Sequence, residues 1–342
     1  MPASISSAER YSRQVLFRGI GAQGQERLAT SQVAVAGCGA TGAAVAGLLA
    51  RAGVGTLVLI DRDFVEESNL QRQVLFDEAD AREGLPKAEA ARRKIGLFNS
   101  DVTVLAQVAD LVPGNIHPLL AGSTLVLDAT DNFETRYLIN DYAIEQATTW
   151  IYAGVVGAYA VGMNILPGET ACLACLFPDP PQGLVETCET AGVLNTAVNL
   201  AASIQATEAL KCLVGARDTM RRTLISHDLW TNERSEVSAQ LPRTGCRTCQ
   251  LRDFQHLRGE SRPHITLCGR NSVQIHEHAR PVEFASLAAR LAPLGEVRYN
   301  GLTLRFRRGP HTLTVLADGR ALIQGTADVM QARSLYARFL GS

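Results

Sequence analysis

The sequence shows no strong excess of either charge and contains few aromatic residues. Its 342 residues carry 33 basic and 34 acidic side chains, for a formal net charge of −1, and 6% of them are aromatic. Such a balance creates no overall field that would attract nucleic acid or an anionic membrane surface. We therefore expect neither nucleic acid nor a membrane among the partners of this chain.

Long hydrophobic runs are also missing. The longest uncharged apolar stretch, residues 150–163, is interrupted by three glycines and is too short to span a bilayer. Residues 1–10 lack the apolar stretch typical of a signal peptide. We expect a cytoplasmic protein, whose eight cysteines serve metal binding or catalysis rather than disulfide bonds.

The sequence does contain a regular alternation of apolar strands and helices. Short apolar runs, typical of buried parallel strands, end at Gly37, Asp61 and Asp128, and helical segments separate them. The predicted strands are residues 33–36, 56–60, 102–107, 125–127, 225–230 and 235–239, and the predicted helices are 10–28, 42–52, 87–97 and 193–214. This order predicts an α/β fold with a Rossmann-like, doubly wound and mostly parallel sheet.

A second, smaller unit is expected after Gln250. Five segments there alternate like strands and two look helical, and Asp318-Gly319 is a hairpin turn signal. We predict a first domain over residues 1–254 and a small α+β domain over residues 255–342. The second domain shows no catalytic constellation, and its role stays open.

A glycine-rich loop follows the first predicted strand. Gly37, Gly39 and Gly42 fit the pattern Gly-x-Gly-x-x-Gly between a strand and a helix. Glycines let the backbone approach a phosphate, and the helix N-terminus offers free N–H groups to its charge. Asp61 ends the next strand, where a carboxylate can accept hydrogen bonds from a ribose. The motif therefore predicts a nucleotide site, against the alternative of a purely structural turn.

Basic residues after the second strand favour a triphosphate over a dinucleotide. Arg72 lies in the polar run 68–73, and Lys87 follows Gly84-Leu85-Pro86, both after strands of the predicted sheet. Each alone could be a solvated surface charge. Asp131, beyond the strand that ends at Asp128, is our candidate ligand for Mg²⁺. Asp128 itself could cap a helix or serve a structural hydrogen bond.

Two Cys-x-x-Cys pairs predict a structural zinc site. Cys172 and Cys175 follow a Pro-Gly turn, and Cys246 and Cys249 follow Gly245. Structural zinc takes four tetrahedral ligands, commonly as such closely spaced pairs. A zinc ion here would staple two distant segments of the first domain.

The other cysteines divide into two groups. Cys188 precedes a predicted helix start, which favours a reactive thiolate, but Glu186 and Glu189 beside it oppose one, so both readings stay open. Cys38, Cys212 and Cys268 are interpreted as small apolar residues.

Taken together, these motifs resemble the ThiF/MoeB/HesA family, the bacterial relatives of ubiquitin-activating enzymes. The resemblance covers residues ~10 to 250, and the motifs follow one another in the family's order. The matching stretches are Arg10 to Gln14, the glycine loop, Asp61 to Asp63, Ser68 to Gln73, Gly84 to Lys87, Asp131-Asn132, Thr187-Cys188, Ala191 to Val193 and both cysteine pairs.

The resemblance implies an ATP-dependent activity on a protein partner. Family members bind Mg²⁺ and ATP and adenylate the C-terminal glycine carboxylate of a small ubiquitin-like sulfur carrier, releasing pyrophosphate. A sulfur donor, such as a cysteine desulfurase or a rhodanese, then supplies the sulfur of a thiocarboxylate. Thiamin synthesis, molybdenum cofactor synthesis and tRNA thiolation all use this chemistry. The predicted second domain, absent from the shortest family members, resembles the C-terminal extension of some longer ones. This extension and the context of Cys188 favour a thiamin-type member slightly.

The same resemblance assigns roles to individual residues. Asp61 would contact the ribose, Arg72 and Lys87 the phosphates with help from Asn69, and Asp131 the Mg²⁺ ion. Arg13 would reach the phosphates from the other subunit of a homodimer. Cys188 matches a cysteine that some members link covalently to the carrier. Further nucleotide contacts are expected from Gly37, Gly39, Ala40, Gly42, Asp63, Ser68 and Asn132.

One position of the loop departs from the family. Ala40 stands where members usually have a further glycine, and it would weaken nucleotide binding if that position needed a positive φ. We take alanine to be small enough.

Two other functions are compatible with parts of this sequence. An NAD-dependent oxidoreductase could use the same loop, but the first histidine is His117, so the first 110 residues offer no histidine for hydride chemistry. A non-catalytic scaffold of the same fold is disfavoured because Arg72, Lys87 and Asp131 are all retained.

Overall fold

The protein is described here from a computed structural model. It describes residues 7–179, 191–259, 266–267, 272–275, 281–299, 301, 303–317, 319, 321–326 and 328–340. The chain divides into two compact units, Met1–Ser261 and Arg262–Ser342.

An eight-stranded sheet forms the centre of the first unit, in the order β3-β2-β1-β4-β5-β6-β7-β8. In this order, the first five strands run parallel to one another, and β6, β7 and β8 each pair antiparallel with the strand before them. Their bounds are β1 Gln32–Ala36, β2 Thr56–Ile60, β3 Thr103–Gln107, β4 Leu125–Asp128, β5 Thr149–Val156, β6 Tyr159–Ile165, β7 Thr223–Asp228 and β8 Glu233–Ser238. This confirms the predicted Rossmann-like, mostly parallel sheet.

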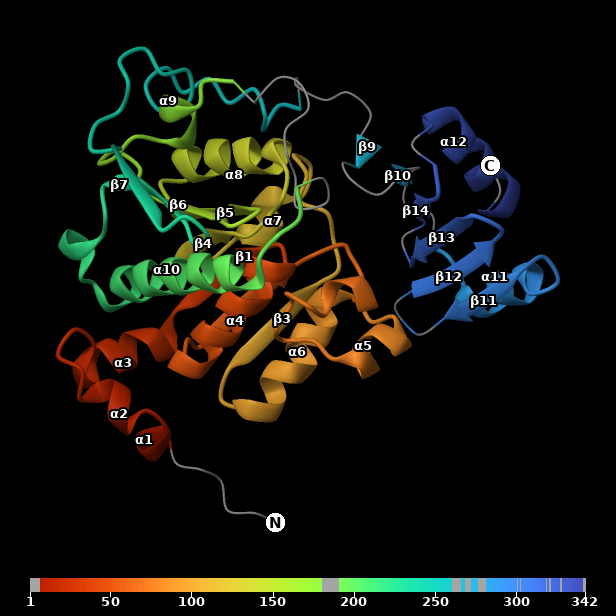
Figure 1. Cartoon of the computed structure of the whole chain (residues 1–342), viewed down its shortest axis with the longest axis horizontal. Helices are drawn as coiled ribbons and strands as arrows, with labels where there is room; N and C mark the ends of the chain where they lie inside the picture. The colour runs from red at the N-terminus through yellow and green to blue at the C-terminus, as the bar shows by residue number, and fades with distance from the viewer. Residues whose placement is uncertain are drawn as a thin grey trace. The chain divides into compact units, whose positions relative to one another are not determined.

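Helices cover both faces of this sheet because its buried strands are apolar on both sides (Figure 1). On β1, Val33 and Val35 join the core beneath α4 Ala40–Ala52, α6 Lys87–Phe98 and α10 Asn195–Val214. Ala34 and Ala36 point to the opposite core, which contains α7 Ile116–Leu120 and α8 Phe133–Glu145. The alternation of successive side chains thus gives each face its own helical layer.

The carboxyl ends of β1, β2 and β4 lie next to one another at one edge of the sheet. Chain order reverses here, because β1 pairs with β2 on one side and with β4 on the other. Ligands bind outside the carboxyl ends of the strands at such a switch point. The glycine loop and Asp61 follow β1 and β2, and Asp128 is the last residue of β4.

The N-terminal segment differs from its prediction. Instead of one helix over residues 10–28, there are α1 Ser7–Arg10, α2 Ser12–Val15 and α3 Gly21–Thr30. Gly21 begins the longest of these at φ +62°, a conformation that interrupts a regular helix. The remaining short elements of this unit are η1 Glu67–Asn69, α5 Glu78–Glu83, α9 Leu173–Leu176 and η2 Arg217–Thr219.

The second unit is a six-stranded antiparallel sheet in the order β11-β12-β13-β14-β10-β9. The helices α11 Phe284–Leu291 and α12 Val329–Leu340 share a core with the buried face of the sheet. The strands are β9 Thr266–Leu267, β10 Ser272–Ile275, β11 Glu296–Tyr299, β12 Thr303–Arg308, β13 His311–Leu316 and β14 Ala321–Gln324. An α+β architecture is confirmed, and of the predicted hairpin turn, Asp318 lies outside the described residues.

Within the described part of the chain, no helix is both long enough and apolar enough to cross a membrane.

Candidate active site and metal centre

Three glycines shape the loop between β1 and α4, each for a different reason. Gly37 has a φ of +91°, and a Cβ there would lie 2.7 Å from the Ala129 carbonyl oxygen. A Cβ on Gly42 would lie 1.9 Å from the Gly37 carbonyl oxygen, so the turn closes only without a side chain. A Cβ on Gly39 would meet only the Gln73 side chain, at 4.0 Å. The packing of the protein therefore does not require a glycine at position 39, and its missing side chain leaves open space above the loop.

The helix that follows this loop begins without a side-chain cap. Gly39 is the N-cap residue of α4, and the first turn of the helix carries no acidic residue. Its N–H groups are thus available to an anion placed over the loop. Ala40 is the first helical residue, and it is not among the described non-glycine residues with positive φ. The departure at Ala40 therefore causes no backbone strain.

Asp61 is buried directly beside the loop. Its Oδ2 accepts a hydrogen bond from the Cys38 N–H at 2.6 Å, and its Oδ1 accepts one from the Asp63 N–H at 2.7 Å. Burial raises the pKa of Asp61 to about 6, against the lowering effect of the nearby Lys87 charge. The carboxylate is thus oriented by the backbone of the loop and of the segment after β2.

Lys87 begins α6 and is almost completely buried. Its Nζ lies 3.0 Å from Oδ2 of Asp63, and Asp61 and Asp131 also attract its charge. Burial lowers the pKa of Lys87, but these carboxylates outweigh that effect, so its pKa lies above the ordinary value. The structure therefore places an ammonium that is charged at neutral pH among three acidic residues.

The polar run after β2 turns back toward the glycine loop. Arg72 is partly exposed, and its Nη1 donates to the Ser68 carbonyl oxygen at 2.9 Å. Asn69 and Gln73 are buried, and within the described residues Oδ1 of Asn69 and Oε1 of Gln73 have no hydrogen-bond partner. Such buried, unsatisfied oxygens are costly unless a ligand or water pairs with them.

The segment after β4 joins Asp128 to α8. Asn132 caps this helix, since its Oδ1 accepts the Thr135 N–H at 2.9 Å. Asp131, one residue earlier, is exposed. Asp128 is fully buried, and burial raises its pKa to about 6 while Arg136 acts in the opposite direction. Asp131 and Asn132 were both predicted to contact the nucleotide, and the observed role of the Asn132 side chain is that of a cap.

Two predicted residues stand apart from this cluster. Arg13 is exposed on α2, and in the described part of the chain no hydrogen bond or ion pair links it to the glycine loop or to Lys87. Its expected role is at the nucleotide site of a second subunit. Cys188 lies outside the described residues.

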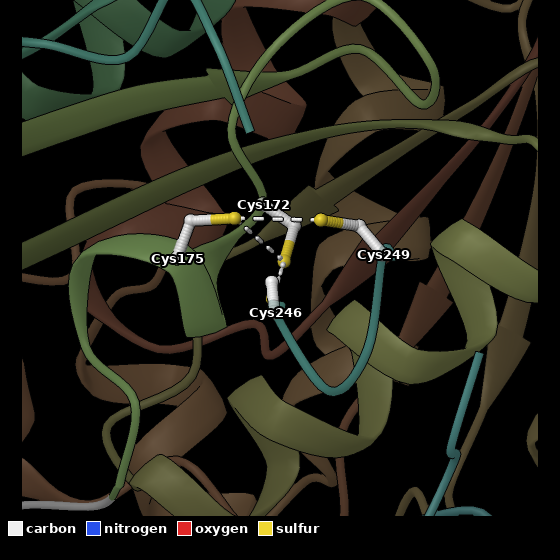
Figure 2. A group of neighbouring side chains, drawn as sticks. All are labelled: Cys172, Cys175, Cys246 and Cys249. Carbon is white, nitrogen blue, oxygen red and sulfur yellow. Dashed lines mark hydrogen bonds between the residues drawn. The ribbon is translucent and has the colours of Figure 1, made fainter. Parts of the chain in front are cut away.

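The four predicted zinc ligands come together in the first unit. Cys172 and Cys175 flank the start of α9, whereas Cys246 and Cys249 lie in the segment after β8. The sulfur atoms of all four lie within 4.8 Å of one another and point toward a common centre (Figure 2). Neighbouring sulfurs are separated by 3.8, 3.7 and 3.4 Å.

These spacings fit a tetrahedral zinc site. Sulfurs bound at about 2.3 Å to one Zn²⁺ ion in a tetrahedron lie about 3.8 Å apart. The Arg243 N–H also points to Sγ of Cys175 at 3.3 Å, the kind of contact that stabilises a thiolate. The cluster can therefore hold zinc and join two segments 74 residues apart.

A buried carboxylate supports the second cysteine pair. Asp141 of α8 accepts a hydrogen bond from Thr248 Oγ1 at 3.2 Å and from the His256 N–H at 2.9 Å. Burial raises the pKa of Asp141 to about 6, and these hydrogen bonds limit the shift. The cysteine-bearing segment is thus anchored to α8 independently of any metal.

Sequence reasoning gave no role to three residues of this region. Arg62 forms an ion pair with Asp110 at 2.9 Å, and its charge interacts with that of Asp131. Gln73 faces Gly39, and Arg136 contacts Asp128 and Thr130. Arg62 and Gln73 belong to the motifs already quoted, but only the fold reveals what they face.

Comparison with known proteins identifies the family. The model of the ThiF family matches residues 11–248. The chain is similar to the sulfur carrier protein ThiS adenylyltransferase of Bacillus subtilis, with 42% identity over 97% of this chain and 99% of the relative. It is also similar to the SAMP-activating enzyme E1 of Haloferax volcanii, with 39% identity over 64% of this chain and 81% of the relative.

A solved structure shows the same architecture. The crystal structure of Escherichia coli MccB with ATP superimposes with a TM-score of 0.62 at 25% identity, covering 70% of this chain and 74% of MccB. The match of the family model to most of the chain, and of the Bacillus relative to nearly all of it, agrees with the resemblance noted in the motifs. The chain belongs to the ThiF family.

Proposed function

We propose that this protein is an adenylyltransferase that activates a small ubiquitin-like sulfur carrier. It uses ATP to adenylate the C-terminal glycine carboxylate of the carrier and releases pyrophosphate, which prepares the carrier for thiocarboxylate formation. The names of the relatives support this class of substrate. The observation that carries the proposal is the buried, charged Lys87 beside an uncapped helix N-terminus and a glycine loop with open space at Gly39.

The chemistry needs positioning and charge neutralisation rather than a general base. The carrier carboxylate is already ionised, and its oxygen attacks the α-phosphorus of ATP. The bond from that phosphorus to the bridging oxygen of the β-phosphate breaks, and pyrophosphate leaves with the electron pair. Arg72, Lys87 and the N–H groups of α4 would neutralise the charge that develops on the phosphates. The pKa of Lys87, raised by its carboxylate partners, keeps its positive charge at neutral pH.

The residues present also fit Mg²⁺. Magnesium retains several waters and binds proteins through one or two carboxylates together with substrate phosphates. Asp131 is exposed, and its charge interacts with those of Lys87 and Arg62. A triphosphate that binds here would meet both these cations and a metal ion on Asp131. Asp131 would hold the ion, which supplies neutralisation of the phosphate oxygens.

The cluster of Cys172, Cys175, Cys246 and Cys249 would hold a structural zinc ion. All four of its ligands are thiols, which leaves no open position for a substrate at a four-coordinate ion. Its contribution is to the folded state of the first unit rather than to the reaction. A cytoplasmic location, where thiols stay reduced, would keep these cysteines available to the metal.

We infer that the carrier is of the ThiS type, in thiamin biosynthesis. The Bacillus relative bearing that name matches 97% of this chain, so the similarity extends through the second unit as well. Carriers of molybdenum cofactor synthesis or tRNA thiolation are the competing substrates within the same chemistry. In this proposal Cys188 serves the later sulfur transfer, with a cysteine desulfurase or rhodanese as sulfur donor. A homodimer would bring Arg13 of the second subunit to the phosphates.

Replacement of Lys87 tests the proposal directly. Lys87→Ala removes the buried ammonium, and we expect carrier-dependent adenylation to fall roughly 100-fold or more. Lys94→Ala is the matched control, because Lys94 lies on the same helix but pairs with Asp77 and Asp80 outside the site. The measurement is pyrophosphate release with ATP and a carrier ending in Gly-Gly. Equal activity of the two variants would contradict the proposed role of Lys87.

A further inference from the structure

The segment that carries Asp131 is held unusually firmly at its base. It connects β4 to α8, and we call residues 129–132 the β4–α8 loop. Its first residue, Ala129, touches Gly37 of the glycine loop closely enough that no Cβ fits between them. Gln205 of α10 donates through its Nε2 to the Asp128 and Ile151 carbonyl oxygens, both at 2.8 Å. The start of the loop is thereby fixed to the neighbouring strand and to a helix.

Thr130 is held through its amide, its hydroxyl and its carbonyl. Oδ1 of Asp128 accepts hydrogen bonds from the Thr130 N–H at 2.8 Å and from the Thr130 hydroxyl at 2.7 Å. Nη2 of Arg136 donates to the Thr130 carbonyl oxygen at 2.7 Å. This carbonyl belongs to the peptide that leads into Asp131, so Arg136 fixes the orientation of that peptide plane.

Arg136 is itself locked in place. It is 7% exposed, and its guanidinium lies over the rings of Phe133 at 5.0 Å and Tyr152 at 5.1 Å. Its Nε is 3.6 Å from Oδ2 of Asp128, which has no hydrogen-bond partner within the described residues. The guanidinium thus forms one hydrogen bond, to the Thr130 carbonyl, and one ion pair, to Asp128. A single ammonium would not reach both positions in the same way.

The two ends of the loop are fixed, whereas the side chain between them is free to act. Asn132 caps α8 just beyond the loop, and Thr130 is anchored just before it. Asp131 between them is exposed, and its charge interacts with those of Lys87 and Arg62. A carboxylate held in this way needs little reorganisation to bind a metal ion, which favours affinity.

We propose that Arg136 is a positioning residue, which orients Asp131 for Mg²⁺ through its hydrogen bond to the Thr130 carbonyl. This inference rests on the proposed function, since it assumes that Mg²⁺ and ATP bind at this edge of the sheet. It differs from a purely structural role, in which Arg136 would serve only to neutralise the buried Asp128.

Arg136→Lys separates the two roles. A lysine keeps a positive charge near Asp128 but has no planar fork with which to reach both Asp128 and Thr130. We expect the midpoint of the Mg²⁺ titration of ATP binding to rise about ten-fold or more in this variant. The affinity for ATP in EDTA should stay within about two-fold of wild type, because the phosphate-binding cations are untouched.

A second variant guards against a loss of folding. Asp128→Asn combined with Arg136→Met removes both buried charges together, so that neither is left unpaired. This double variant should show the same weakened Mg²⁺ response as Arg136→Lys. Asp131→Asn defines the full effect of losing the ligand, and Arg136→Lys added to Asp131→Asn should change the Mg²⁺ midpoint no further.

ATP binding is measured by equilibrium dialysis with the full-length protein, in EDTA and over a series of Mg²⁺ concentrations, with thermal unfolding in parallel. A wild-type Mg²⁺ midpoint in Arg136→Lys would overturn the inference and leave Arg136 a structural residue. Absence of any Mg²⁺ effect on ATP binding by the wild-type protein would instead count against the proposed function, and with it this inference.

Discussion

At the scale of single residues, the glycine loop contains one glycine that the fold requires, Gly42, and one that only a bound ligand would require, Gly39. Gly42 has no room for a Cβ, which would lie 1.9 Å from the Gly37 carbonyl oxygen. Gly39 has that room and keeps an ordinary φ of −73°. Its lack of a side chain therefore matters only when something else approaches the loop, as a phosphate would.

The two glycines should respond differently to the same substitution. Gly39→Ala should leave the free energy of unfolding within about 1 kcal/mol of wild type, while the affinity for ATP falls about ten-fold or more. Gly42→Ala should lower the free energy of unfolding by about 3 kcal/mol, because the backbone must move to accept the methyl group. Urea unfolding and ATP dialysis on both variants check this.

Gly96→Ala provides a control, because Gly96 lies within α6 and a Cβ there meets no atom within 4 Å. It should stabilise the protein slightly and leave ATP binding unchanged. Normal ATP affinity in Gly39→Ala would mean that no phosphate lies over this part of the loop.

Residue types were predictable where a motif marks them, but their contacts were not. Asp61 and the four cysteines are marked by motif spacing, whereas Lys87, which alone could be a surface charge, was assigned to the phosphates through the family resemblance. Lys87 pairs with Asp63, 24 positions away, because the connection between β2 and α6 folds back on itself, and no local pattern records this. The contacts of Arg136 were missed for a similar reason, because the turn between β4 and α8 brings Arg136 back to Asp128 and Thr130.

At the scale of elements, the four-cysteine cluster brings α9 together with the segment after β8. Both cysteine pairs pack in the core that also contains α7 and α8. A bound metal would therefore hold these two segments against this core. Separating these segments would expose apolar surface of that core to water.

Loss of a single ligand should release the metal. Cys246→Ser should lower the bound zinc from about one ion per chain to nearly none, and lower the free energy of unfolding by about 5 kcal/mol. Cys212→Ser is the matched control, since Cys212 lies on α10 outside the cluster. Elemental analysis and thermal unfolding of both variants decide the matter, and full zinc content in Cys246→Ser would refute a four-thiolate site.

An element could be predicted from the sequence when its pattern of apolar and polar residues was clear. The strands β1, β2 and β4 are short apolar runs that end at polar or glycine residues, so the sequence marks them clearly. Helix α8 went unassigned because its residues 135–144 are all buried, which hides the alternation of polar and apolar faces. The apolar run 150–163 proved to be the hairpin of β5 and β6, which turns at Gly157 with a φ of +59°.

At the scale of the whole molecule, the residues of the proposed nucleotide site and the four-cysteine cluster all belong to the first unit. The family model ends at residue 248, and the second unit has a core of its own. The similarity to the Bacillus relative nevertheless covers 97% of the chain and therefore includes the second unit as well as the first. We propose that the first unit carries out the adenylation and that the second unit serves a separate need, such as recognition of a partner.

The central claim is that this protein adenylates a sulfur carrier, and ATP–pyrophosphate exchange tests it most directly. Purified protein, Mg²⁺, ATP and labelled pyrophosphate are combined with one candidate carrier at a time, each ending in Gly-Gly. We predict that label enters ATP only when a carrier is present, that a ThiS-type carrier supports the fastest exchange, and that deleting the terminal glycine abolishes it. Absence of exchange with every carrier, in a protein that still binds ATP and Mg²⁺, would contradict the account.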